Sequence, residues 1–430
     1  MSEIKMAVDI DTFEFIWSDE QEELFNCLDN SNESIFLSGN AGTGKTTTVN
    51  RWLKTQGERV VILAPTGIAA LNIGGQTIHS FFGLPPDTLN ILDAPSFLDS
   101  KYTVDKLRAC KCMLLDEISM VRLDIFEVMN RMFQYVKGNN LPFGGVRMIL
   151  VGDLMQLPPV VKQGAESEYL EHIGSPKGWF FAGDAYKNLN PRRFFLTKSF
   201  RQKDPYFYAL LNRVRSGDKK VVTEINRAVR PITEASDELR LCTTNSSVDM
   251  TNERKFLSLP GEKSTYVGQL VDKFPEKQAP LPVHLNLGVG ARVMTIKNGT
   301  GYVNGSLGEI VKLDDDFVSV QLDQGGTVRV GLAEWVANEY KMEGGKLGKT
   351  TKGLYRQIPV RLAWAMTIHK SQGQGFDSAI VDFGRNAFVH GQAYVALSRL
   401  RSLEGMFLSR PMRPSDIIVD HEVLNFLESE

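Results

Sequence analysis

Residues 39–46, GNAGTGKT, stand between the apolar run 35–37 and a stretch with helical character. They match the spacing G-x-x-x-x-G-K-[ST], in which each residue type has a physical task. The glycines let backbone N–H groups crowd around a polyanion at the positive end of a helix, the lysine neutralises outer phosphates, and the last hydroxyl can reach Mg²⁺. An ordinary glycine-rich turn is the alternative. The residues expected to contact a nucleotide here are Gly42, Thr43, Gly44, Lys45, Thr46 and Thr47.

Polar side chains follow two further apolar runs. Asp116 and Glu117 come directly after 113–115, where ligands of open α/β sheets collect. Asp116 fits a magnesium ligand together with Thr46, and Glu117 fits the base that activates water, although a surface acidic pair is the alternative. Gln156, after the run 148–151, is placed to sense the γ-phosphate.

Phosphoryl transfer also needs positive charge on the developing anion, commonly from arginines of a neighbouring domain. Arg201 and Arg399 are the candidates, and a surface ion pair is the alternative for each. Lys45, Glu117, Gln156, Arg201 and Arg399 form the expected catalytic set.

Two segments combine small hydroxyl residues, a histidine and exposed backbone, which suits contacts to phosphodiesters and bases of a single strand. They are 65–67 together with 77–82, and 367–373, and their candidate contacts are Pro65, Thr66, Thr77, His79, Thr367, His369 and Lys370. The alternative is that both histidines are core residues. The basic, glycine-rich stretch 346–356 is predicted to be a loop, either a solvated linker or an arm over a nucleic acid backbone.

Short apolar runs separated by helical stretches predict parallel strands of a doubly wound α/β sheet. In the first half these runs are 35–37, 60–64, 113–115 and 148–151, and apolar residues at helical spacing predict a core-facing helix over 123–136. From about residue 193 a second α/β domain is expected, without a second phosphate loop. Its predicted strands are 194–196, 239–242, 360–364, 379–381 and 406–408.

Two insertions interrupt this pattern. Strands at 291–296, 308–313, 317–322 and 327–330, separated by turn residues, predict a small β-barrel inserted in the second domain, and 83–110 is a smaller insertion in the first. The expected boundaries are 1–82 and 111–190 for the first domain, 191–255 and 352–430 for the second, and 256–351 for the barrel.

The composition is that of a globular protein, with 42% hydrophobic and 23% charged residues among 430. A formal net charge of −2 excludes coating of nucleic acid through bulk positive charge, so such a partner needs a local basic groove. Four cysteines without C-x-x-C spacing predict no structural metal. No signal peptide is recognised in residues 1–15, and no apolar run reaches the roughly 18 residues of a membrane span, so a cytoplasmic protein without membrane contact is expected.

Taken together, these stretches resemble the superfamily 1 helicases, and most closely the Pif-type (petite integration frequency) branch, superfamily 1B. The matching motifs are SDEQ (18–21), GNAGTGKT (39–46), APTGIAA (64–70), TIHSFF (77–82), DEISM (116–120), GDLMQLPP (152–159), FRQ (200–202), TIHKSQG (367–373) and YVALSR (394–399). The resemblance implies two RecA-like domains, with a wedge at 83–110 and a Src-homology-type barrel.

The same resemblance implies an ATP- and Mg²⁺-dependent motor that moves 5′ to 3′ on single-stranded DNA and unwinds duplex at single-strand/duplex junctions, with family activity extending to G-quadruplexes and RNA–DNA hybrids. It assigns Gln21 to the adenine, Gln372 and Gly373 to the nucleotide, and Asn245 to the DNA track. A monomer is expected, with a dimer on DNA as the alternative. An RNA helicase of the same superfamily and a DNA-stimulated ATPase that binds without unwinding are the rival functions.

Overall fold

The computed structural model describes residues 17–85, 88–202, 204–232, 238–343 and 346–429. The N-terminal residues on which the expectation of no signal peptide rests lie outside these ranges. Across the described residues, no helix is both long and apolar enough to cross a membrane.

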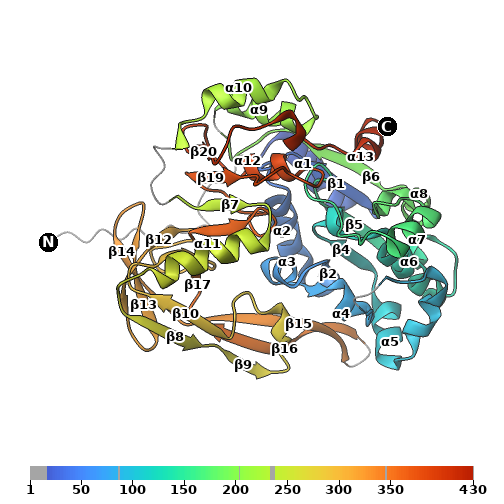
Figure 1. Ribbon diagram of the computed structural model, residues 1–430. Coiled ribbons are helices and arrows are strands. Elements are labelled where there is room, and N and C mark those ends of the chain that lie inside the picture. The colour runs from blue at the N-terminus through green and yellow to red at the C-terminus, as the bar shows by residue number, and fades with distance from the viewer. Residues whose placement is uncertain (1–16, 86–87, 203, 233–237, 344–345, 430) are drawn as a thin grey trace.

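The first domain is built on a six-stranded parallel sheet with the order β3-β2-β4-β5-β1-β6 (Figure 1). Its strands are β1 (Ile35–Gly39), β2 (Val61–Ala64), β3 (Gln76–Thr77), β4 (Cys112–Leu115), β5 (Arg147–Val151) and β6 (Arg192–Leu196). The four predicted strands of this half are therefore confirmed as β1, β2, β4 and β5. The run 194–196, predicted to open the second domain, is instead part of β6, which pairs in parallel with β1 at the edge of the first sheet.

Alternate residues of these strands face opposite layers of helices, as the period of two requires. Ile35 and Leu37 pack in one core with Trp52 of α2, whereas Phe36 packs with Phe126 and Phe133 of α6 in another. The helix bounds are α1 (Asp19–Asn30), α2 (Lys45–Gln56) and α6 (Leu123–Lys137). The predicted helix over 123–136 is thus confirmed with its apolar stripe buried.

The second domain has a smaller parallel sheet, ordered β18-β7-β19-β20. Its strands are β7 (Arg240–Cys242), β18 (Ala365–Thr367), β19 (Ala379–Asp382) and β20 (Met406–Leu408). Three predicted strands are confirmed as β7, β19 and β20. Outside the smaller insertion, the other α-helices of the described residues in the two motor domains are α3 (Gly67–Asn72), α4 (Ile78–Phe82), α7 (Ala165–Ile173), α8 (Asp184–Leu189), α9 (Pro205–Arg215), α10 (Val221–Ala228), α11 (Asn245–Leu257), α12 (Gln392–Leu397) and α13 (His421–Glu428).

The inserted strands are antiparallel and lie in three sheets, at the lower left of Figure 1. The five-stranded sheet has the order β14-β13-β12-β11-β17, and its first four members are the four predicted strands. The bounds of the inserted strands are β8 (Lys263–Val267), β9 (Gln269–Asp272), β10 (His284–Gly288), β11 (Arg292–Thr295), β12 (Leu307–Leu313), β13 (Phe317–Leu322), β14 (Thr327–Gly331), β15 (Ala333–Glu343), β16 (Lys346–Gln357) and β17 (Val360–Leu362).

Two predictions about this segment are wrong. The run 360–364 was expected in the second motor sheet, but β17 pairs antiparallel with β11, so the insertion extends to Leu362 rather than residue 351. The basic stretch 346–356 is not a loop, because it forms β16 and pairs with β15 and β9. At its other end the insertion begins after α11, which runs on to Leu257, past the expected boundary at 256.

The smaller insertion contains the 3₁₀ helix η2 (Ile91–Leu98) and α5 (Lys101–Ala109). α5 contacts β15, so the two insertions touch each other beside the motor domains. The C-terminal helix α13 returns to the first domain, where the ring of Phe426 stacks on Phe181, with 4.1 Å between centroids. Lys177 and Trp179 both bond to Asp420, just before α13. These contacts hold the second domain against the first.

Candidate nucleotide cleft and nucleic-acid track

A cleft of about 410 Å³ opens at the carboxyl edge of the first sheet and is closed from the opposite side by the second domain. Its walls come from the loops after β1, β4, β5 and β6 and from the second domain. The lining residues are Ala41, Gly42, Thr43, Gly44, Lys45, Thr46, Thr47, Asp116, Glu117, Val151, Gly152, Asp153, Gln156, Phe200, Arg201, Gly373 and Arg399. The whole expected catalytic set and both expected magnesium ligands therefore lie around one cleft.

The phosphate loop has the backbone that its glycines permit. Gly42 and Gly44 have φ angles of 79° and 80°, in the left-handed region that favours glycine. A Cβ on Gly42 would lie 2.5 Å from the Cβ of Arg201, so a side chain there would displace the arginine. α2 begins at Lys45, and its free N–H groups face the cleft as an anion site.

The Lys45 ammonium is folded into the loop, where Nζ donates to the carbonyls of Gly39 at 2.8 Å and Asn40 at 3.1 Å. Burial in the cleft lowers the pKa of Lys45, while Asp153 and Glu117 oppose that shift. A bound polyphosphate would favour the charged ammonium for the same electrostatic reason.

Asp116 and Glu117 stand at the end of β4 as predicted. Burial, and then repulsion by Glu117, raises the pKa of Asp116 to about 7. Burial also raises the pKa of Glu117, opposed by Lys45 and Arg399. Glu117 has a left-handed backbone with φ 52°, a strained conformation that such residues adopt mainly at functional sites. The pair thus faces the cleft rather than forming the acidic surface patch of the alternative reading.

The two arginines enter the cleft from different directions. Arg399 is 1% exposed, and its guanidinium donates to the carbonyls of Val395, Ser371 and Gln374. Arg201 donates to the carbonyls of Ser398 and Gly373. Among the described residues neither arginine forms an ion pair with a carboxylate, so the surface ion pair of the alternative reading is not what the structure shows.

Burial lowers the pKa of both guanidiniums, and for Arg399 burial, and then the charge of Arg201, lowers it to about 9. Glu117 and Asp153 oppose this shift in Arg399, but neither forms an ion pair with it among the described residues, and two neighbouring cations are costly in the protein alone. An anion placed between them would relieve that cost, so the arrangement favours a triphosphate in the cleft.

Gln156 points back into the first domain, where its Nε2 donates to Asp153 Oδ2 at 3.2 Å. Asp153 also pairs with Arg215 of α9 at 3.3 Å, across the domain boundary. Sequence reasoning missed Asp153, although it stands inside the GDLMQLPP motif. Gln156, the expected γ-phosphate sensor, is therefore linked to the second domain through Asp153.

Two expected nucleotide contacts lie outside the cleft lining. Gln21 is fully buried and donates through Nε2 to the carbonyl of Thr43 and to Thr48 Oγ1, which places it behind the phosphate loop. Gln372 is also not among the lining residues, and its buried Nε2 has no hydrogen-bond partner among the described residues. Phe200, which sequence reasoning did not select, lines the cleft beside Arg201.

All the expected nucleic-acid contacts except Thr77 line one of two hollows, one on each motor domain. In the first domain, Pro65, Thr66 and His79 line a hollow of about 180 Å³ at the ends of β2 and β3. Thr77 is not in its lining, and its hydroxyl caps α4 by accepting from the N–H of Ser80. His79 is half-buried, and burial lowers its pKa.

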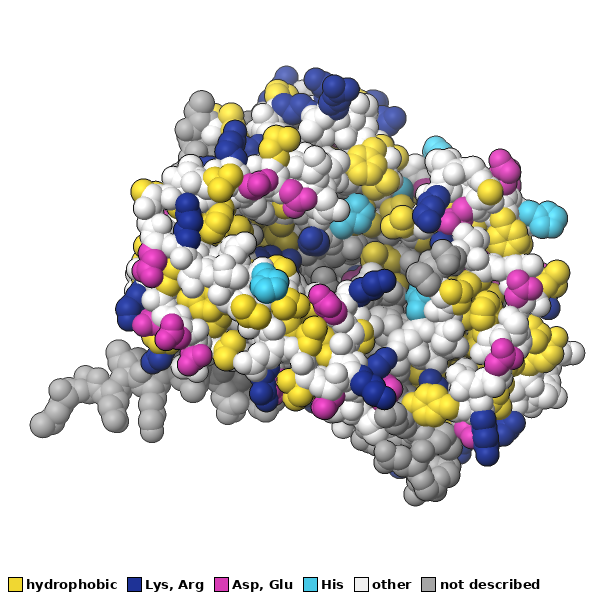
Figure 2. All heavy atoms as spheres, turned by 60° about the horizontal axis from the view of Figure 1, so that its bottom comes forward, with side chains coloured by type: hydrophobic (Ala, Val, Ile, Leu, Met, Phe, Trp, Pro, Cys, Tyr) yellow, Lys and Arg dark blue, Asp and Glu magenta, His cyan; other side chains and the backbone are white. Residues whose placement is uncertain are grey.

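The second hollow measures about 450 Å³ and lies at the ends of β18 and β7. It is lined by Thr243, Thr244, Asn245, Thr367, His369, Lys370 and Phe388, which include every contact expected in this domain. His369 is half-buried here rather than a core residue, and burial lowers its pKa. Figure 2 shows a central hollow on the face with the inserted strands forward, and the side chains around it include Lys, Arg and His as well as Asp, Glu and hydrophobic residues.

Comparison with known proteins agrees with this geometry. The profile of the PIF1-like helicase family matches residues 16–224. The human ATP-dependent DNA helicase PIF1 is 34% identical over 415 residues, which are 92% of this chain and 61% of that protein. The chain therefore spans less than two thirds of the human relative. The ATP-dependent DNA helicase Pif1 of Bdellovibrio bacteriovorus is 32% identical over 427 residues, which cover 95% of this chain and 91% of that protein.

Among solved structures, Pif1 of Bacteroides sp in complex with ADP-AlF4 is 35% identical, with a TM-score of 0.88 over 97% of both chains. Bacteroides Pif1 bound to ssDNA is 35% identical and has a TM-score of 0.67 over 96% of both chains. The structure as a whole is thus more similar to this ADP-AlF4 complex than to the ssDNA complex. On the identity and coverage of these relatives, the chain belongs to the family of Pif1 helicases.

Proposed function

We propose that this chain is an ATP-dependent DNA helicase that moves 5′ to 3′ along single-stranded DNA and unwinds duplex ahead of it. The observation that carries the proposal is the composition of the cleft. A phosphate loop and two carboxylates face two arginines that form no ion pair with a carboxylate among the described residues. Each domain also has its own hollow for a strand.

Hydrolysis follows from the positions of these groups. Lys45 and the N–H groups at the start of α2 bind the phosphates, and Glu117 orients and deprotonates the attacking water. Arg201 and Arg399 stabilise charge that develops on the γ-phosphoryl group. Through Arg399 the second domain thereby acts on a nucleotide held by the first.

The residues present fit Mg²⁺. Thr46 and Asp116 line the same cleft and offer a hydroxyl and a carboxylate, the hard oxygen donors that Mg²⁺ prefers alongside phosphate oxygens. Across the described residues no group of three or more Asp, Glu, His or Cys side chains could hold a metal ion by itself. When bound, Mg²⁺ neutralises phosphate charge.

Coupling to DNA requires that the two hollows move relative to each other as the cleft closes and opens. Gln156 and Asp153 lie at that boundary, and Arg215 holds Asp153 from the second domain. Closure of the cleft on ATP and its opening after hydrolysis would then cause the two hollows to hold the strand in alternation. Because both halves of the cleft belong to one chain, a monomer should suffice, and a dimer on DNA is the alternative.

Single-strand/duplex junctions are the proposed substrate, and G-quadruplexes and RNA–DNA hybrids are further substrates that the family relationship suggests.

The test is strand displacement from duplexes with a 5′ tail or a 3′ tail, with ATP and Mg²⁺. We expect displacement from the 5′-tailed duplex only, and none by Lys45→Ala, which removes the phosphate-binding ammonium. Displacement from the 3′ tail alone would overturn the direction. DNA-stimulated hydrolysis without displacement of any duplex would favour a binding ATPase, and equal or better activity on matched RNA would favour an RNA helicase.

A further inference from the structure

An aromatic side chain stands among the polar residues of the second hollow. Phe388, in the connection that follows β19, is 57% exposed and lines this hollow together with Thr244, His369 and Lys370. Single exposed apolar residues are common on protein surfaces, so exposure alone carries no meaning. The position of Phe388 inside a hollow that presents hydroxyls, an imidazole and an ammonium is what sets it apart.

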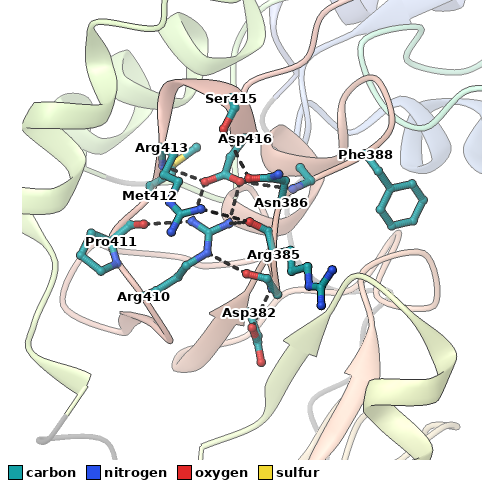
Figure 3. A network of polar contacts seen from close by, with 12 residues as sticks. Asp382, Arg385, Asn386, Phe388, Arg410, Pro411, Met412, Arg413, Ser415 and Asp416 are labelled. Carbon is teal, nitrogen blue, oxygen red and sulfur yellow. Dashed lines mark hydrogen bonds and ion pairs between the residues drawn. The ribbon is translucent and has the colours of Figure 1, made fainter.

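The connection that carries Phe388 is held firmly by a buried ion pair (Figure 3). Both terminal nitrogens of Arg410 donate to the fully buried carboxylate of Asp416, each at 2.8 Å. Arg410 also donates to the carbonyls of Gly384 and Arg385. One guanidinium therefore fixes the first part of the connection through its backbone.

The remaining backbone on either side of Phe388 is fixed as well. The N–H of Ala387 donates to Asp416, and the N–H of Phe388 donates to Oε1 of the buried Gln392 at 3.0 Å. In Figure 3 the ring of Phe388 points away from this network. A backbone that is bonded on both sides and still presents a large ring to water is preorganised for contact with something else.

We propose that Phe388 is the stacking face for a base of the single strand that this hollow binds. Lys370 and the hydroxyls of the hollow can contact the sugar-phosphate backbone, and an aromatic face beside such donors suits any base, because every base has a π face. The inference rests on the proposed function, because it names a contact for the strand that the motor follows.

Two residues further on, the same connection crosses to the first domain. The Nε2 of His390 bonds to the carbonyl of Leu154 at 2.8 Å, two residues before the expected γ-phosphate sensor, Gln156. The segment that carries Phe388 is thus bonded to the first domain as well as to the second. Its contact in the first domain, Leu154, is two residues from Gln156 in the lining of the nucleotide cleft.

The test is equilibrium binding of the full chain to fluorescein-labelled oligo(dT), measured by fluorescence anisotropy, with Phe388→Ala, Phe388→Leu and Phe388→Trp. Loss of one stacked base should weaken binding roughly 5- to 100-fold in the alanine variant. The leucine variant keeps apolar volume without a π face and should bind almost as weakly, whereas the tryptophan variant should bind like the unmodified protein. Tyr135→Ala, which removes a 61% exposed aromatic ring from α6, is the matched control and should have no effect.

Two further measurements separate stacking from a general loss of structure. On an oligonucleotide of equal length whose sugars carry no bases, the unmodified and Phe388→Ala proteins should bind equally. The salt dependence on oligo(dT) should be unchanged by Phe388→Ala, because no phosphate contact is lost, whereas Lys370→Ala should reduce the slope by about 0.7.

Equal binding of oligo(dT) by Phe388→Ala and Tyr135→Ala would overturn the stacking role and leave the proposed function intact. An equal loss on the base-free strand would also overturn it, because the ring would then act through structure alone. Absence of oligo(dT) binding by the unmodified protein would instead contradict the proposed function. If the alanine variant unfolds, the comparison of leucine with tryptophan decides the question alone.

Discussion

Ala41 in the phosphate loop donates its backbone N–H to the phenolic oxygen of Tyr394 in α12, at 2.8 Å. The loop belongs to the first domain and the tyrosine to the second, five residues before Arg399. Both groups are buried. One hydrogen bond therefore connects the phosphate loop to the chain segment that contains the buried Arg399.

Removing this acceptor should weaken the contact between the domains. In Tyr394→Phe the buried N–H of Ala41 loses its partner, which should lower the free energy of unfolding by about 1–3 kcal/mol. Urea denaturation of the nucleotide-free protein measures this loss. Tyr206→Phe, at an exposed ring on α9, is the control and should leave the free energy unchanged. A Tyr394→Phe protein as stable as the control would show that the hydrogen bond contributes nothing.

The two cleft arginines should affect turnover far more than nucleotide binding. Arg399→Ala and Arg201→Ala should each lower kcat for ATP hydrolysis about 10³-fold, the lower end of the effect of arginine fingers elsewhere. Lysine should restore little, because the guanidinium fork holds several carbonyls at once. DNA-stimulated ATPase assays and binding of a labelled ATP analogue provide the readouts. Arg401→Ala, whose side chain pairs with Asp377 outside the cleft, is the control. Normal kcat in either cleft variant would remove that residue from the mechanism.

Glu117→Gln should separate ATP binding from ATP hydrolysis. The amide keeps the size of the side chain but cannot accept a proton, so kcat should fall about 10²- to 10⁴-fold while ATP remains bound. Single-turnover hydrolysis and nucleotide binding measure the two effects separately. If Glu117→Gln hydrolysed ATP normally, another group would have to activate the water.

Much of the nucleotide cleft was predictable because its residues follow strands that the sequence marks clearly. Lys45, Glu117 and Gln156 each lie in a segment that follows an apolar run, and parallel strands bring their carboxyl ends to one edge. The residues that make contacts between the two domains were harder to predict in this way. Tyr394 and Asp153 make contacts with segments that are remote in the sequence, and the spacing of neighbouring residues does not predict such contacts.

The errors in domain boundaries have a related cause. An apolar run specifies a strand but does not specify its partner, so β6 and β17 were recognised as strands and assigned to the wrong sheets. β16 was missed as a strand because glycine and lysine are poor strand formers, and its pairing with β15 overrides that preference. Phe388 has no motif or periodicity around it, and only the folded structure shows that it lies beside Thr244, His369 and Lys370.

The contact between the domains should also depend on pH through His390. Burial has the largest effect on this imidazole and lowers its pKa, and the charge of Lys177 lowers the pKa further. The hydrogen bond to Leu154 and the charges of Asp420 and Asp153 favour the charged form but do not offset the effect of burial. Its Nδ1 accepts the N–H of Asp420 at 2.8 Å, an interaction that protonation would destroy. Because the folded pKa is lower than the unfolded one, the stability contributed by the neutral ring is present above the unfolded pKa. It is lost as the pH falls towards the folded value.

Acidification from about pH 7.5 to about pH 5.5 should therefore lower the Tm of the unmodified protein by more than that of His390→Gln, which has nothing to protonate at this position. At the higher pH the variant should be the less stable of the two, since glutamine cannot reproduce both hydrogen bonds of the ring. His421→Gln, at an exposed histidine in α13, controls for loss of a titrating group as such. The Tm difference between the unmodified protein and His390→Gln must shrink on acidification, and a constant difference would mean that His390 holds the domains together without sensing pH.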